Sequence, residues 1–219
     1  MTAKRIRLGL QLLGTIAIVA WIPGNAAKLV AMLVIWPLGF GGVSRREVVL
    51  MIGVNLLFIC MNLGALSKGA FRFTSPDALG MPMYEFVMWG FYTLNTIRFL
   101  DGTAPRGSRW PTVILAAAFA ATFSIVSEPG VLTLLSGTVL LISLALYREP
   151  MDFAYAAYML IVGASIEYVG VWTGQWSYPG NPLGGVPPWF IPMWGGVGLF
   201  TRRLLLPLLP QDAGSAASG

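Results

Sequence analysis

Eight apolar runs, each bounded by proline, glycine or charged residues, take up most of this 219-residue chain. They cover residues 8–22, 26–40, 48–66, 82–100, 111–126, 131–147, 153–172 and 187–206. A helix needs about 20 apolar residues to cross the hydrocarbon of a bilayer, and several of these runs are shorter. Tight breaks at residues 23–25 and 128–130 predict hairpins whose helices lie at different depths, so seven crossings is an alternative to eight.

Composition decides between a water-soluble and a membrane-embedded helical protein. Hydrophobic residues make up 56% of the chain and charged residues 11%, and the mean hydropathy is +0.73. Soluble domains carry about a quarter of their residues charged, and a chain of this length cannot hide so much apolar surface from water. We therefore predict an all-α, polytopic integral membrane bundle of about eight transmembrane helices.

Basic residues favour one side of this predicted bundle. With eight crossings, eleven fall on the side of the termini: Lys4, Arg5, Arg7, Arg45, Arg46, Arg98, Arg106, Arg109, Arg148, Arg202 and Arg203. Only Lys28, Lys68 and Arg72 fall on the other side. Because cytoplasmic loops carry an excess of Lys and Arg, we predict that both termini are cytoplasmic and that the protein lies in the cell inner membrane. The net charge of +5 thus reflects topology, and we expect no nucleic-acid partner.

The two halves of the chain repeat each other at an offset of 105 residues. Residues 69–98 align without a gap to 174–203, with nine identities in thirty positions that include Pro82/Pro187 and Trp89/Trp194. We predict two parallel four-helix repeats, residues 1–105 and 106–210, related by an axis along the membrane normal, with a disordered tail at 211–219. The repeat gives the first apolar run a counterpart, which argues against reading that run as a signal peptide.

Histidine is absent from the sequence, and Cys60 is its only cysteine. The usual ligands of haem, zinc and copper and the commonest general base are therefore missing. An internal disulfide is excluded, and Cys60 is expected to be a packing residue. We predict no metal and no cofactor.

Two glutamates break the symmetry of the repeat. Glu167 in the seventh run aligns with Asn62, and Glu85 at the start of the fourth run aligns with Phe190. A carboxyl at this depth must be paired, protonated or beside a wet cavity, so both are candidate catalytic residues. The candidate substrate-binding residues are Asn62, Trp89, Tyr92, Trp176, Tyr178 and Trp194.

A structural role is an alternative for each of these residues. Glu167 would then be a neutral acid bonded to a neighbouring helix, and Glu85 would cap the start of its own helix. The Trp-Gly pairs would serve helix packing, while Trp176, Tyr178 and Trp189 would anchor the chain at the membrane interface.

The stretch from Glu167 through Gly170, Gly174 and Tyr178 to Trp194 resembles the signature region of membrane carotenoid-biosynthesis proteins of the carotenoid hydratase type. It is also similar to the small integral membrane terpene cyclases. The resemblance covers about a fifth of the chain, and the first half has Asn62 in place of the leading glutamate. It implies an isoprenoid substrate, Glu167 as the acid, and Tyr178 and Trp194 as pocket lining.

Three functions follow as hypotheses. The first is a metal-independent membrane enzyme, a cyclase or hydratase, in which a carboxylic acid protonates a double bond or epoxide of an isoprenoid or related lipid, and aromatic faces stabilise the cation. The second is a transporter of a small organic or lipid molecule. The third is a non-catalytic subunit of a membrane complex. Each implies a membrane or lipid partner, and the oligomeric state is left open.

Overall fold

The computed structural model describes residues 2–180 and 183–209 and contains eight α-helices in those residues. The elements are α1 (Ala3–Trp21), α2 (Asn25–Phe40), α3 (Arg45–Ser67), β1 (Arg72–Phe73), α4 (Glu85–Leu100), α5 (Arg109–Ile125), α6 (Pro129–Tyr147), α7 (Pro150–Trp172), β2 (Trp176–Ser177) and α8 (Phe190–Phe200). A π turn, η1 (Thr201–Leu205), and a 3₁₀ turn, η2 (Leu206–Leu208), continue α8. The tail that we predicted to be disordered lies outside the described residues.

Local sequence signals start most of these helices where the apolar runs predicted them. Ser44 and Glu47 form a capping box at the start of α3, and Pro129 and Pro150 occupy the first turns of α6 and α7. Proline suits that position because its missing N–H would have no partner there. The fourth and eighth runs begin at Pro82 and Pro187, and their helices start three residues later, at Glu85 and Phe190.

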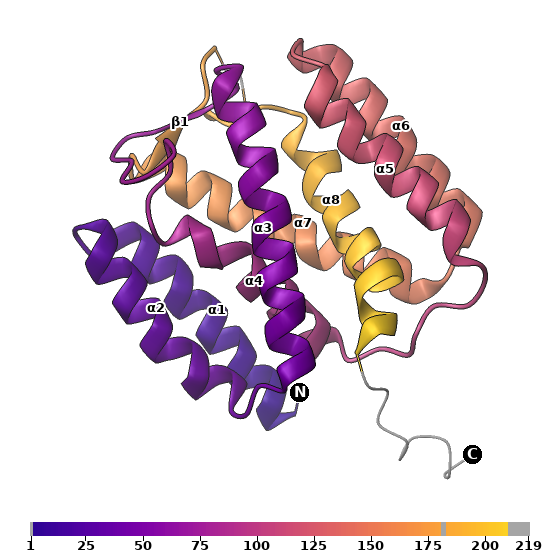
Figure 1. Cartoon of the computed structure of the whole chain (residues 1–219), viewed down its shortest axis with the longest axis horizontal. Coiled ribbons are helices and arrows are strands. Elements are labelled where there is room, and N and C mark those ends of the chain that lie inside the picture. Colours follow the sequence, from indigo (N-terminus) through magenta and orange to yellow (C-terminus); the bar gives the residue numbers. More distant parts are fainter. Residues whose placement is uncertain (1, 181–182, 210–219) are drawn as a thin grey trace.

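Helices α4, α7 and α8 lie in the middle of the bundle, between an outer hairpin of α1 and α2 and a second outer hairpin of α5 and α6 (Figure 1). The start of α1 and the η2 end of the described chain lie on one face, which we call the terminal face. Strands β1 and β2 and the loop between β1 and α4 lie on the opposite face, the ribbon face. Most of α4 is buried, from Glu85 to Ile97.

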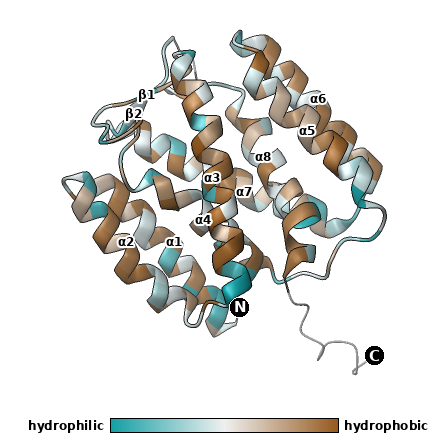
Figure 2. Ribbon diagram, viewed as in Figure 1, coloured by the Kyte–Doolittle hydropathy of each residue, from teal (hydrophilic) through white to brown (hydrophobic). Residues whose placement is uncertain are grey.

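The surface of the bundle is suited to lipid. Helices α3, α6 and α7 are long and apolar enough to cross a membrane, and α2 and α5 are shorter apolar helices. Hydrophobic residues are frequent along the outer helices (Figure 2). Many of their side chains are exposed, among them Leu13, Leu38 and Ile114, each more than 60% exposed. A water-soluble monomer does not expose apolar surface on this scale. The protein is therefore a helical membrane protein, as predicted.

Interfacial tryptophans are also present, though at positions that the sequence analysis did not select. Trp21 and Trp172 end α1 and α7 on the ribbon face, and Trp110 lies in the first turn of α5. All three are more than 70% exposed. Exposed indoles at helix ends are typical of the membrane–water boundary.

The offset of 105 residues relates the two halves of the fold. Helix α3 maps onto α7 and α4 maps onto α8 with its η1 extension, while α1 and α2 map onto α5 and α6 within a few residues. The strand pairs Arg72–Ser177 and Phe73–Trp176 join equivalent loops. The rings of Trp89 and Trp194, which are equivalent residues, stack with centroids 4.8 Å apart. The pseudo-two-fold axis therefore runs from the ribbon through this tryptophan pair, and the two four-helix repeats are parallel.

Equivalent ion pairs join the ends of equivalent helices on the terminal face. Arg98 of α4 binds Glu47 of α3 at 2.8 Å, and Arg203 binds Asp152 of α7 at 2.7 Å. In the second copy, Arg202 also binds Asp152 and Glu149. The side chains of Arg202, Arg203 and Asp152 are buried. The sequence analysis used Arg98 and Arg203 only to predict topology, but both join neighbouring helices within a repeat.

Candidate functional site

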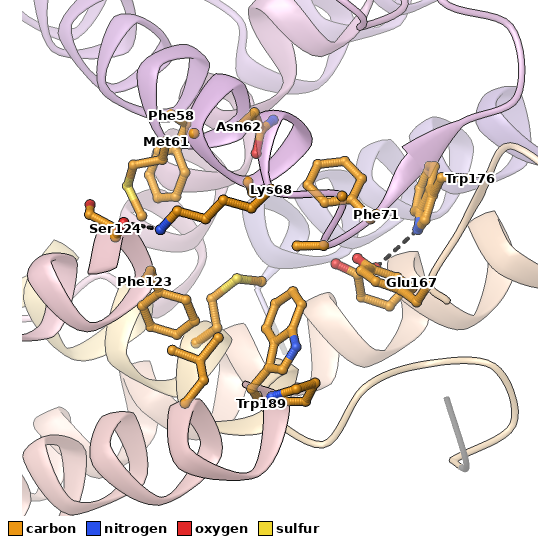
Figure 3. Close-up of a pocket in the computed structure, with 18 of the residues that line it drawn as sticks. Phe58, Met61, Asn62, Lys68, Phe71, Phe123, Ser124, Glu167, Trp176 and Trp189 are labelled. Atoms are coloured by element: carbon orange, nitrogen blue, oxygen red, sulfur yellow. Dashed lines mark hydrogen bonds between the residues drawn. The ribbon is translucent and has the colours of Figure 1, made fainter. Parts of the chain in front are cut away.

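A cavity of about 380 Å³ lies between α3, α4, α5, α7 and α8, beneath the ribbon (Figure 3). Its walls come from the ribbon-face ends of these helices, from β1 and β2, and from the turn between α5 and α6. Most of the lining is aromatic or aliphatic. The volume lies in the range of pockets that hold small molecules.

All eight residues that the sequence analysis selected line this one cavity. They are Asn62, Glu85, Trp89, Tyr92, Glu167, Trp176, Tyr178 and Trp194. They come from both repeats and from five elements, so the fold brings together residues more than 130 positions apart in sequence. Their catalytic or binding roles stay predictions.

Glu167, from the last third of α7, has three hydrogen-bond donors around its carboxyl. The indole N–H of Trp176 and the hydroxyl of Tyr178 donate to Oε2 at 3.0 and 2.6 Å, and the indole N–H of Trp194 donates to Oε1 at 3.2 Å. Figure 3 shows Glu167 and Trp176 joined at one end of the cavity. Indole N–H groups can only donate, so this arrangement holds Glu167 as a hydrogen-bond acceptor in a fixed orientation.

Glu85 lies in the first turn of α4 and is 8% exposed. Its carboxyl accepts no hydrogen bond from any residue in the described part of the chain, and no side chain caps the start of α4. The capping role considered for Glu85 is therefore not what the structure has. A buried carboxyl without a partner is costly, so Glu85 is an acidic group of this cavity that is free to bind a donor.

The aromatic wall is built on the pseudo-two-fold axis. Trp89 stacks on Phe58 with centroids 3.8 Å apart and on Trp194 on its other face. Phe58 is equivalent to Gly163 in the second copy, and a Cβ at Gly163 would come within 2.1 Å of the Trp194 ring. The glycine thus makes room for the second indole.

The ribbon-face ends of α3 and α5 approach each other beside the cavity. Lys68, just after α3, donates a hydrogen bond to the backbone carbonyl of Ser124 at the end of α5 (Figure 3). Among lining residues, Lys68 and Phe123 had no signal that identified them beforehand, because nothing in the sequence predicts that α3 approaches α5.

Trp176 and Trp189 are buried lining residues, 5% and 7% exposed, and do not anchor the chain at the interface. Trp189 could have been selected from the repeat, since it aligns with Tyr84. In the described residues, no group of three or more His, Cys, Asp or Glu side chains is placed to hold a metal ion.

Comparisons with known proteins identify the fold. The sequence matches no known family, and no curated protein matches it. A crystal structure of a mycobacterial Insig homologue, MvINS from Mycobacterium vanbaalenii, matches with a TM-score of 0.64 and 19% sequence identity. The match covers 76% of this chain and 96% of MvINS. A cross-linked MvINS trimer gives a TM-score of 0.63 over the same shares of the two chains.

These matches define the class of protein as a helical membrane bundle with an Insig-like fold. The resemblance to carotenoid hydratases and terpene cyclases, on which the isoprenoid-enzyme prediction relied, is therefore wrong.

The structure explains why the motif misled. A Cβ at Gly170 would lie 2.0 Å from the Trp176 ring. Trp176 pairs with Phe73 across the ribbon. Val186 forms a β-bridge with Leu183, and the equivalent residues of the first repeat, Met81 and Ala78, form the same bridge. The glycines, aromatic residues and Gly-Val-Pro of the motif thus build the repeat scaffold.

Proposed function

We propose that this protein binds a membrane lipid in the cavity and acts without catalysis. The lipid would have a compact apolar body and a small polar end that carries a hydroxyl group. The observation that carries the proposal is the unpartnered Glu85 carboxyl at the wall of a mostly apolar cavity. Such a group is stabilised when a ligand supplies the missing hydrogen-bond donor.

Glu167 supports binding over proton donation. Three donors from the protein already surround its oxygens, so its orientation is fixed before a ligand arrives. The carboxyls of Glu167 and Glu85 are both hydrogen-bond acceptors, and they favour a lipid whose polar end carries a donor. The stacked rings of Phe58, Trp89 and Trp194 favour a lipid with a flat apolar body. Preorganised sites of this kind bind with a smaller entropy cost.

We further infer that the bundle lies in the inner membrane with both ends of the chain in the cytoplasm. The support is the excess of eleven basic residues over three between the two sides, together with the position of the start of α1 and of η2 on one face. The cavity would then open near the outer leaflet.

Lipid mass spectrometry on protein purified from its native membranes tests the proposal. We expect one hydroxyl-bearing lipid at a fixed ratio to wild-type protein and its loss in Gly64→Phe. Gly64 lines the cavity, and a Cβ added there meets no atom within 4 Å, so the ring can enter without a clash at Cβ.

Gly53→Phe is the matched control. Gly53 lies in the same helix, also has open space around an added Cβ, and is exposed outside the cavity lining. Equal lipid content in wild type and Gly64→Phe, or equal loss in both variants, would contradict the proposal.

A further inference from the structure

A second pocket lies on the ribbon face, at the start of α2. Its lining is more polar than that of the cavity proposed to bind lipid, which we call the lipid cavity. Its volume is about 490 Å³. The α1–α2 turn and the loops before α4 and after α7 line it, with Asn25, Lys28, Ser75, Asp77 and Gln175 among the polar members. None of these residues lines the first cavity.

Lys28 is the buried charge of this pocket. It is 4% exposed, its Nζ donates to the side-chain oxygen of Gln175, and the same atom lies 5.4 Å from the centre of the Tyr84 ring. No ion pair to Lys28 exists among residues 2–180 and 183–209. The lysine therefore neither extends into bulk solvent nor pairs with a carboxylate in the described residues. Buried charges normally have an opposite charge beside them.

The start of α2, which no side chain caps, also lines the pocket. Gly24 precedes α2 and supplies no side chain, and the first turn of α2 contains no acidic residue. The N–H groups of Asn25, Ala26 and Ala27 have no acceptor in the described part of the chain. Such N–H groups and the helix dipole both favour a negative charge.

The equivalent helix start in the second repeat, that of α6, has a carboxylate that α2 lacks. At the start of α6, the Glu128 carboxylate accepts the N–H groups of Gly130 and Val131 at 2.8 and 2.5 Å. The residue equivalent to Glu128 is Pro23, and the residue equivalent to Lys28 is Thr133. In the second copy a carboxylate of the chain binds the first N–H groups of the helix, whereas in the first copy no carboxylate in the described residues binds them and a lysine is buried beside them.

We propose that this pocket binds an anionic phosphate group, held by Lys28 and the first N–H groups of α2 where Glu128 lies in the other copy. The phosphate could belong to a lipid headgroup or be free in solution, because both present the same oxygens. Asp77 is an acidic lining residue that opposes such binding, but its carboxylate already accepts the Met83 N–H at 2.8 Å. The proposal is independent of the lipid cavity.

The test uses the full chain in two settings. Inorganic phosphate is titrated into detergent-solubilised protein by calorimetry, and native mass spectrometry compares phosphatidylglycerol with phosphatidylcholine nanodiscs. We expect saturable binding in at least one setting. Phosphate binding indicates a free anion, and selective retention of phosphatidylglycerol alone indicates a headgroup.

Four variants then locate the site. Lys28→Gln should weaken binding about tenfold or more, because it removes a charged hydrogen-bond donor, and Lys28→Arg should preserve it. Pro23→Glu should also weaken binding by supplying the internal carboxylate, and Asp77→Asn should strengthen it. Gel filtration establishes that each variant is folded.

Arg72→Gln is the control, since Arg72 is an exposed cation of the same face outside both pockets. Absence of binding to the wild type in both settings would overturn the proposal, as would equal weakening by Lys28→Gln and Arg72→Gln.

Discussion

The two outer hairpins of this bundle occupy equivalent places but are held in different ways. In the first hairpin, the Gln11 side chain donates to the Trp36 carbonyl at 2.8 Å, and the Trp36 indole donates to Thr15 at 3.1 Å. Asn95 of α4 donates to Gln11 at 3.3 Å and accepts from Tyr158 of α7 at 2.9 Å. A continuous polar network therefore ties the first hairpin to the central helices.

The second hairpin has apolar residues at the same positions. Ala116, Ala120 and Leu141 are equivalent to Gln11, Thr15 and Trp36, and Phe200 is equivalent to Asn95. Apolar contacts in lipid do not specify one arrangement as strongly as hydrogen bonds do. Of the two hairpins, only the second contributes to the lining of the cavity, through the end of α5 and the start of α6.

The difference suggests a division of tasks between the copies. The duplicated helices, the ribbon and the tryptophan pair provide one symmetric scaffold. A few unshared residues then give the first hairpin its polar network and place two glutamates at the cavity. The following predictions test that comparison, from the largest expected effect to the smallest.

Asp152→Asn should cost the most stability. Asp152 is fully buried against Arg202 and Arg203, so its loss leaves buried cations short of a partner and should cost about 3–5 kcal/mol. Glu47→Gln, at the equivalent but partly exposed pair with Arg98, should cost about 1 kcal/mol. Unfolding by SDS in mixed micelles measures both. Equal losses would show that the two ion-pair sites carry the same weight.

Gln11→Ala should destabilise the first hairpin by about 2 kcal/mol, because it leaves buried partners in Trp36 and Asn95 without hydrogen bonds. Leu10→Ala is the control, since Leu10 is the preceding residue and is 62% exposed to lipid. The same unfolding assay applies. A smaller loss of stability for Gln11→Ala than for Leu10→Ala would show that the polar network does not stabilise the first hairpin.

Glu85→Leu makes the cavity wall apolar at the position where the second copy has Phe190. We expect about a tenfold loss of affinity for a hydroxyl-bearing lipid, and higher stability without lipid, since a buried unpartnered carboxyl is removed. Lipid titration followed by tryptophan fluorescence, together with unfolding of delipidated protein, checks both effects. Unchanged affinity would exclude Glu85 as the ligand's acceptor.

Glu149, just before α7, should make stability sensitive to acid. Burial raises the pKa of its carboxyl, but hydrogen bonds from Arg202 and the Arg106 backbone, with the charges of Arg202 and Arg203, outweigh burial and bring the pKa below its usual 4.5. A lowered folded-state pKa stabilises the protein above the unfolded value, and this stability is lost as the pH falls through the folded value. Unfolding measured from pH 7 down to acid should decline less steeply in Glu149→Gln than in wild type; parallel curves would contradict this.

Much of the fold could be predicted because its signals are local or repeated. The apolar runs mark the helices, and the offset of 105 residues already pairs α3 with α7 and α4 with α8. The same alignment singled out Glu85 and Glu167 as unshared charges. The division of the chain into domains at residues 105 and 106 stays a prediction.

Tertiary features could not be predicted in the same way. The approach of Lys68 to Ser124 depends on how the two repeats pack against each other. The polar network around Gln11 depends on how α1, α2 and α4 pack within the first repeat. The resemblance to isoprenoid enzymes failed because short Gly-aromatic motifs also arise when indoles must lie against backbone, as Trp176 does at Gly170 and Trp194 at Gly163.

The most direct test of the lipid-binding account is an experimental structure of the protein purified with its native lipids. The account predicts density for one lipid in the cavity, with its apolar body against Trp89 and Trp194 and its polar end within hydrogen-bonding distance of the Glu85 carboxyl. A cavity that holds only water, or a lipid whose polar end points away from both glutamates, would contradict it.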